Sequence, residues 1–266
     1  MILFDSHAHY DDRRFDAEFE GGGRSALLKA HELGVKYIAN IGSSLRNSYN
    51  SVKLADEFDF VIAAVGIHPS DAQEVPAGEV DKTLYEIEKL TENKKVRAIG
   101  EIGYDYHWEP VDKEVQTYFF DAQLTMAERL GLPVIIHSRD AMGDTLDMIA
   151  RHPAVKGVMH SFSRSAEVAR QLCDKGWYVS FSGPLTYKNA NKLKEAAMIV
   201  PSDRVLIETD SPYLPPVPHR GELNYSGYMH YTCEKLAEFR EITPDEAAEM
   251  TYRNACAFYG IDPECR

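Results

Sequence analysis

Histidine and carboxylate side chains recur in this sequence directly after short apolar runs. The first such run, Ile2–Phe4, is followed by His7 and His9. Residues two apart in a strand point to the same side, so both imidazoles are expected to project together, with Asp5 within reach on that side. Two neutral imidazoles on one face form half of a transition-metal site. The alternative is a pair of buried histidines, and the pair alone does not decide between the two.

Five further groups of the same chemistry end or interrupt later apolar runs. They are His68, Glu101, His137, His160 and Asp210. A lone histidine after a strand is more often structural, and a lone carboxylate there can cap a turn. Glu101 lies inside an apolar run, where an unpaired carboxylate is costly and a metal ion would remove that cost. Coincidence at every one of these strand ends is harder to accept than one shared metal site.

The elements that must position these groups alternate along the chain. Strand-like apolar runs occur eight times, at Ile2–Phe4, Val35–Ile41, Phe60–Ile67, Val96–Ile102, Pro133–Ile136, Gly157–Met159, Trp177–Phe181 and Val205–Ile207. Amphipathic stretches separate them, and Gly131 is a predicted helix stop. The alternation predicts an α/β fold, a (β/α)8 TIM barrel with residues 1–266 as one domain, and its chief rival is an open doubly wound sheet. In a barrel the carboxyl ends of the strands share one mouth, where the metal-binding groups would converge.

The segments after the eighth run predict a stiff loop and two closing helices. The prolines of Ser211–Pro218 rule out a continuous helix. The last helix is expected to begin at Thr243, because Pro244 suits the first helical position and Glu246 completes a capping box.

Composition limits the classes of partner and compartment. The 266 residues carry a net charge of −13, so the broad basic surface expected of a duplex-binding protein is absent. Bound divalent cations could still create a local positive site. No signal peptide or membrane-spanning run is indicated, and we expect a cytoplasmic protein with no membrane partner. Without C-x-x-C pairs, reduced thiols are expected at Cys173, Cys233, Cys256 and Cys265.

Seven ordered motifs closely resemble those of the TatD family of metal-dependent hydrolases, within the amidohydrolase-like barrels. They are Asp5–His9, Gly66–Pro69, Gly100–Tyr106, Pro133–Arg139, His160–Ser163, Gly183–Asn189 and Glu208–Leu214, and they run nearly from end to end. The chain departs from the common family pattern at Tyr104, Ser161 and Arg164, where leucine, cysteine and glycine are frequent. These departures alter no predicted ligand and bear on substrate preference.

The resemblance implies two divalent metal ions per chain. His7, His9, Glu101 and Asp210 would hold one ion. Glu101, His137 and His160 would hold the second, with Glu101 bridging. Imidazole mixed with carboxylate suits Zn or Mn, whereas the family is often described with Mg, so all three metals stay open.

The resemblance also implies a phosphodiesterase acting on DNA, from single-stranded or 3′ ends rather than by stable duplex binding. Water bridging the ions would be deprotonated and attack phosphorus. Asp210 is the expected base, and His68 is expected to contact phosphate or the leaving oxygen. Arg139, Lys188 and Arg220 are candidate substrate contacts.

Two other classes of function remain open. One is a metal-dependent hydrolase of another small-molecule ester, amide or lactone, since related barrels use similar sites. Glu101 favours the TatD reading, because some relatives place a carboxylated lysine on that strand and this run contains none. The other is a non-catalytic, partner-binding barrel, which an intact ligand set disfavours. A monomer is the favoured oligomeric state.

Overall fold

Eight parallel strands follow one another in chain order in one sheet, and at least one helix follows each strand. A computed structural model describes residues 1–264. The strands are β1 Leu3–Ala8, β2 Val35–Ile41, β3 Val61–Val65, β4 Val96–Asp105, β5 Val134–Arg139, β6 Gly157–Met159, β7 Tyr178–Phe181 and β8 Val205–Ile207. This is the (β/α)8 barrel fold that the sequence predicts. A doubly wound sheet is excluded because its strand order reverses at a switch point.

Helices separate the strands, and the two predicted closing helices follow β8. The helices are α1 Phe15–Glu18, α2 Gly22–Glu32, α3 Leu45–Glu57, α4 Pro69–Ala72, α5 Val80–Leu90, α6 Lys113–Leu130, α7 Met142–Arg151, α8 Ala166–Asp174, α9 Asn191–Ile199, α10 Met229–Arg240 and α11 Pro244–Tyr259. Helix α6 ends at Gly131, which has a φ of 66°, as predicted. The segment Ser211–Pro218 contains no helix, and α11 begins with the predicted capping box between Thr243 and Glu246.

Besides β1, which reaches Ala8 instead of Phe4, two strands run further than the apolar runs that predicted them. The sequence ends these runs at Ile102 and Ile136, whereas β4 reaches Asp105 and β5 reaches Arg139. Parallel pairing continues to the partners Asp105 and Arg139. The polar ends of both strands are thus held by backbone hydrogen bonds, which an apolar pattern cannot reveal.

The chain forms two compact units. The first unit comprises Met1–Asn40 and the chain from His160 onward, and the second comprises Ile41–Met159. In the first unit α11 packs on β1 and β8. Phe4 of β1 stacks on Tyr259 with 5.5 Å between ring centroids. The Tyr259 hydroxyl donates a hydrogen bond to the carbonyl of Ser6 at 2.7 Å, which fixes the strand that carries His7.

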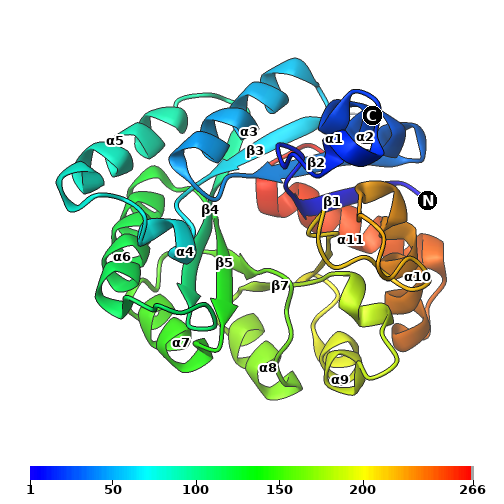
Figure 1. Ribbon diagram of the computed structural model, residues 1–266. Coiled ribbons are helices and arrows are strands. Elements are labelled where there is room, and N and C mark those ends of the chain that lie inside the picture. The colour runs from blue at the N-terminus through cyan, green and yellow to red at the C-terminus, as the bar shows by residue number, and fades with distance from the viewer. Residues whose placement is uncertain (265–266) are drawn as a thin grey trace. The chain divides into compact units, whose positions relative to one another are not determined.

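In the second unit, β3 to β6 carry helices on their outer side, and Figure 1 shows α5, α6 and α7 there. Strands β4 and β5 approach closely at Gly103, whose φ is 140°. A Cβ atom at this position would lie 2.0 Å from the carbonyl oxygen of His137. Only glycine fits there, and its presence lets the two strands that carry Glu101 and His137 stay paired.

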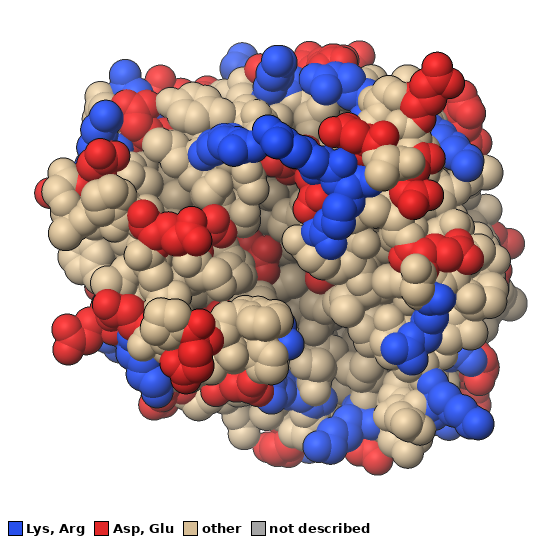
Figure 2. Space-filling model, in the orientation of Figure 1, with Lys and Arg blue, Asp and Glu red and all other residues tan. Residues whose placement is uncertain are grey.

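The other composition-based expectations concern thiols, membranes and surface charge. Cys173, Cys233 and Cys256 are free thiols, and Cys265 lies outside the described residues. In residues 1–264 no helix has the length and apolar character needed to cross a bilayer. Figure 2 shows acidic side chains interspersed among basic ones on the face drawn.

Candidate metal centre

The carboxyl end of β1 gathers three predicted ligands in the first unit. His7 is the fully buried fifth residue of β1, and His9 follows the strand. Their Nε2 atoms lie 3.1 Å apart. Asp210 follows β8, and its Oδ1 lies 3.6 Å from His7 Nε2 and 3.5 Å from His9 Nε2. The Asp210 backbone N–H donates to the carbonyl of His7 at 2.9 Å, which ties the two strand ends together.

These separations fit one metal ion. Ligand bonds of about 2.0–2.2 Å to imidazole nitrogen and carboxylate oxygen place neighbouring ligand atoms roughly 2.8–3.6 Å apart in octahedral or tetrahedral geometry. The three distances in the first unit, 3.1, 3.5 and 3.6 Å, lie at that spacing. The donor set, two imidazoles and one carboxylate, is that of zinc and manganese sites. The residues therefore suit a divalent ion.

His160 brings a fourth predicted ligand to this unit. Its ring stacks on that of His7 with 4.1 Å between centroids. One ligand atom each from His7, His160 and Asp210 can be chosen so that all lie within 4.8 Å of one another. His160 Nδ1 lies 3.2 Å from Oε1 of buried Glu208, and the same oxygen accepts the Ser161 N–H at 2.7 Å. Glu208 thus fixes the orientation of the His160 ring.

The second unit holds the other predicted ligands, Glu101 and His137. His137 Nδ1 lies 2.9 Å from Glu101 Oε1, and its Nε2 lies 3.0 Å from Asp105 Oδ2. His68 Nε2 is 3.8 Å from the same Glu101 oxygen, and its ring lies edge-on to that of His137. Asp105 is buried, and its carboxylate lies beside an imidazole nitrogen of His137 as that of Glu208 lies beside one of His160. A carboxylate behind a histidine is the usual support of a metal ligand.

Electrostatics keeps two of these carboxylates ionised. Burial opposes the charged form of Asp210, but hydrogen bonding with His9 and the nearby His7 and His160 rings hold its pKa below the usual value. For Asp105, burial is likewise outweighed by hydrogen bonds from His137 and from the His107 backbone, and its pKa is also lowered. Both groups are therefore anionic at neutral pH, as a metal ligand or an acceptor for an imidazole N–H must be.

Asp5 supports the site differently from the prediction. We expected it beside the two imidazoles as their hydrogen-bond partner. Its Oδ1 instead accepts the backbone N–H of His7 at 3.3 Å and of Thr209 at 2.9 Å, and its Oδ2 accepts the hydroxyls of Thr209 and Ser226 at 2.5 Å. Burial raises the pKa of Asp5 to about 6 against the opposing effect of these bonds. Asp5 joins the loop after β8 to the end of β1.

The three predicted substrate contacts lie on exposed loops or strand ends. The Arg139 guanidinium lies 5.2 Å from the Trp108 ring centroid, and that of Arg220 lies 4.3 Å from the Tyr187 ring centroid. Lys188 is exposed and follows Tyr187 in the chain. Arg220 and Lys188 therefore share a neighbourhood in the first unit, while Arg139 belongs to the second.

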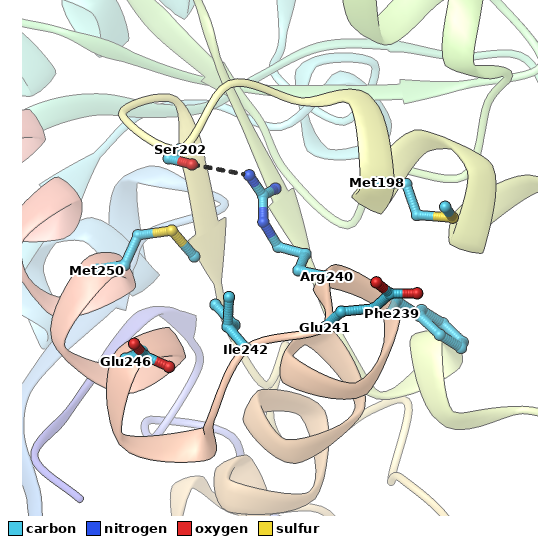
Figure 3. Close-up of a pocket in the computed structure, with 8 residues that line it drawn as sticks. All are labelled: Met198, Ser202, Phe239, Arg240, Glu241, Ile242, Glu246 and Met250. Atoms are coloured by element: carbon cyan, nitrogen blue, oxygen red, sulfur yellow. Dashed lines mark hydrogen bonds between the residues drawn. The ribbon is translucent and has the colours of Figure 1, made fainter.

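A pocket of about 520 Å³ in the first unit is lined by other residues (Figure 3). It lies between the ends of α9 and α10 and the start of α11. Its Ser202 precedes β8, whereas Asp210 follows the opposite end of that strand. Arg240 donates to the carbonyls of Ala197 and Val200 at 2.9 Å, so its guanidinium caps the end of α9. Arg240 in this pocket therefore has a structural role.

Sequence reasoning missed the supporting roles of Asp105 and Glu208. Both lie in the quoted motifs, and Glu208 directly follows an apolar run. A buried carboxylate without a partner is costly, and that argument, applied to Glu101, would have singled out Glu208 as well. No comparable signal marks Asp105, because the sequence places it beyond the end of its strand.

Comparisons with known proteins agree with the fold. The family model described as "TatD related DNase" matches residues 4–260. The uncharacterized metal-dependent hydrolase YabD of Bacillus subtilis is 39% identical over 98% of this chain and 100% of its own length. The uncharacterized metal-dependent hydrolase YcfH of Escherichia coli is 34% identical over 98% of this chain and 97% of its own. The crystal structure of YJJV, a TatD homolog from E. coli, superposes with a TM-score of 0.89 at 28% identity, covering 98% of both chains. The chain therefore belongs to the TatD family of metal-dependent hydrolases.

Proposed function

We propose that this hydrolase is a divalent-metal-dependent phosphodiesterase that cleaves DNA from single-stranded or 3′ ends. The observation that carries the proposal is the cluster of His7, His9 and Asp210 ligand atoms at coordination spacing. The description of the matching family as related to a DNase supports the choice of substrate.

The proposed ligand set comprises the six residues that the motifs place at strand ends: His7, His9, Glu101, His137, His160 and Asp210. Two ions are proposed, with Zn, Mn and Mg as the candidate metals. Within the first unit this set comprises three imidazoles and a carboxylate, and within the second unit it comprises an imidazole and a carboxylate. When bound, such ions lower the pKa of water and stabilise charge on phosphoryl oxygens.

The chain's own residues would handle protons and phosphate. Asp210, held ionised by its histidine neighbours, is the proposed acceptor of the proton of the attacking water. His68 Nδ1 accepts the backbone N–H of Ser70 at 3.1 Å. A neutral His68 therefore carries its proton on Nε2, the nitrogen 3.8 Å from Glu101. That N–H is the proposed donor to a phosphate oxygen or to the leaving oxygen.

Substrate binding is proposed to depend on few positive side chains. A net charge of −13 disfavours the binding of long duplexes. Arg139, Lys188 and Arg220 are the proposed phosphate contacts, and a single strand needs fewer such contacts than a duplex. The protein is proposed to act as a monomer in the cytoplasm.

The test is a substrate screen on protein loaded with one defined metal at a time. Metal content would be measured by elemental analysis, with His9→Ala as the ligand variant and His219→Ala as the control, because His219 is outside the ligand set. About two ions per chain, and hydrolysis of linear single-stranded DNA well above that of closed circular duplex, are expected. Equal rates on both DNA forms would refute end preference. Turnover of lactones or amides but not of DNA would refute the phosphodiesterase function and support a hydrolase of small-molecule esters, amides or lactones.

A further inference from the structure

The loop between β4 and α6 presents a large aromatic side chain to solvent. Trp108 is 60% exposed, whereas Trp177, the other tryptophan of the chain, is 3% exposed. Single exposed apolar residues are common and need no explanation by themselves. Trp108 differs from such a residue because its neighbours hold it in place.

Two side chains fix the Trp108 ring. The His107 ring lies 4.8 Å from it, at an interplanar angle of 89°. His107 Nδ1 in turn lies 3.1 Å from Asp140 Oδ2. The Arg139 guanidinium lies over the indole ring at 5.2 Å from the centroid. A ring held in this way loses little conformational entropy when a ligand stacks on it, which is the property of a preorganised binding surface.

The loop that carries this ring is tied to the candidate metal centre. Asp105 Oδ1 accepts the backbone N–H of His107 at 2.8 Å, and Asp105 Oδ2 lies 3.0 Å from Nε2 of His137. The same carboxylate therefore supports a proposed metal ligand and the residue next to Trp108. At its other end the loop is held by the bond from the Asp112 backbone N–H to the Gln73 side chain. A group bound on Trp108 would have a defined position relative to His137.

The charged residues in and beside the loop favour an uncharged, planar ligand. Glu109, Asp112 and Asp140 are carboxylates in or beside the loop, and they outnumber Arg139 and Lys113. A phosphate group alone would meet net repulsion there. A nucleobase can stack on the indole without needing net positive charge, and Arg139 can then contact the phosphate attached to it.

We propose that Trp108, flanked by His107 and Arg139, is the stacking site for an unpaired nucleobase of the DNA strand being cleaved. This deepens the proposed function, on which it rests, by assigning a residue that distinguishes nucleotide substrates from other phosphodiesters. Trp108 is a specificity residue and takes no part in bond cleavage. Stacking requires an unpaired base, which agrees with a preference for single strands.

Intrinsic fluorescence tests the site independently of hydrolysis. The probe is 2′-deoxyadenosine 5′-monophosphate, which has a base and no phosphodiester bond, and 2-deoxyribose 5-phosphate is the base-free control. The tryptophan fluorescence of the metal-loaded protein should be quenched by the nucleotide and should not be quenched by the sugar phosphate. In Trp108→Tyr, where buried Trp177 is the one remaining tryptophan, the quenching of tryptophan emission should disappear. Absence of quenching in the unaltered protein overturns the base site, whether or not the protein cleaves DNA.

Kinetics provides the second test. Loss of one base stack should raise KM for a short single-stranded oligonucleotide by about 5- to 150-fold in Trp108→Ala, with kcat little changed. Trp108→Tyr should restore most of the affinity, and an oligonucleotide of abasic residues should show no difference between variants. Tyr85→Ala is the matched control, since Tyr85 is 56% exposed with Lys89 Nζ 5.4 Å from its ring centroid on α5. Unchanged KM in Trp108→Ala overturns the proposal. Quenching without DNA cleavage would keep Trp108 as a nucleobase-binding residue and refute the nuclease function.

Discussion

Replacing Glu208 by glutamine would change one buried carboxylate into an amide of the same shape. Its Oε1 carries both bonds that matter, from the Ser161 N–H at 2.7 Å and to His160 Nδ1 at 3.2 Å. The amide oxygen can keep both bonds but loses the negative charge. Hydrogen bonds to charged groups contribute about 1.5–3 kcal/mol and neutral ones about 0.5–1.5 kcal/mol. The His160 bond should therefore weaken by about 1–1.5 kcal/mol.

This loss should appear as weaker metal binding. If Glu208 fixes the tautomer and direction of His160, about 1–1.5 kcal/mol corresponds to roughly a 5- to 13-fold higher Kd for the ion that His160 holds. Glu208→Ala removes both bonds and should approach the upper end of the roughly 10- to 100-fold effect of losing such a supporting group. The other ion should be retained with nearly unchanged affinity.

The assay is competition with a chelator at fixed pH, with the thermal unfolding of the metal-free protein measured in parallel. Glu222→Gln is the matched control, because Glu222 also pairs with a histidine, His219, at 2.8 Å but lies outside the ligand set. It should leave both affinities unchanged. Unaltered metal affinity in both Glu208 variants, with the fold intact, would refute the supporting role and leave Glu208 as a packing residue.

Three further predictions concern turnover, stability and thiol chemistry. Asp210→Asn should lower turnover by about a hundredfold or more, as loss of a general base does, measured at saturating metal alongside metal content. Thr243→Ala should lower the free energy of unfolding by about 1 kcal/mol, since it removes the cap of α11, and Thr243→Ser should not; thermal or urea unfolding measures both. Burial raises the pKa of Cys173 to about 11 and that of Cys233 to about 12, so in Cys265→Ser protein these thiols should react with Ellman's reagent at pH 7.5 only after unfolding.

Each of these predictions has a result that would contradict it. Near-normal turnover in Asp210→Asn would remove this residue from the role of base. An unchanged unfolding curve for Thr243→Ala would mean that tertiary packing alone holds the start of α11. Rapid labelling of the folded Cys265→Ser protein would show that the structure opens around α8 or α10 at neutral pH.

The sequence by itself determined the alternation of elements and the identity of the ligand candidates. Apolar runs flanked by turns predicted β2, β6 and β8 with the observed bounds, because a strand covered on both faces leaves a continuous apolar pattern. The spacing of His7 and His9 predicted that their rings lie together, and their Nε2 atoms are 3.1 Å apart. Both signals come from residues that are close together in the chain, so the sequence alone contains them in full.

The tertiary structure decided which groups support the ligands. Asp105 lies 32 residues from its partner His137, and Glu208 lies 48 residues from His160. Asp5 was expected beside the imidazoles, yet its oxygens are taken by Thr209 and Ser226 from the loop after β8. The direction of a side chain depends on which donors the fold brings to it. Hydrogen bonds between residues this far apart in sequence leave no periodic pattern, and only the folded chain shows them.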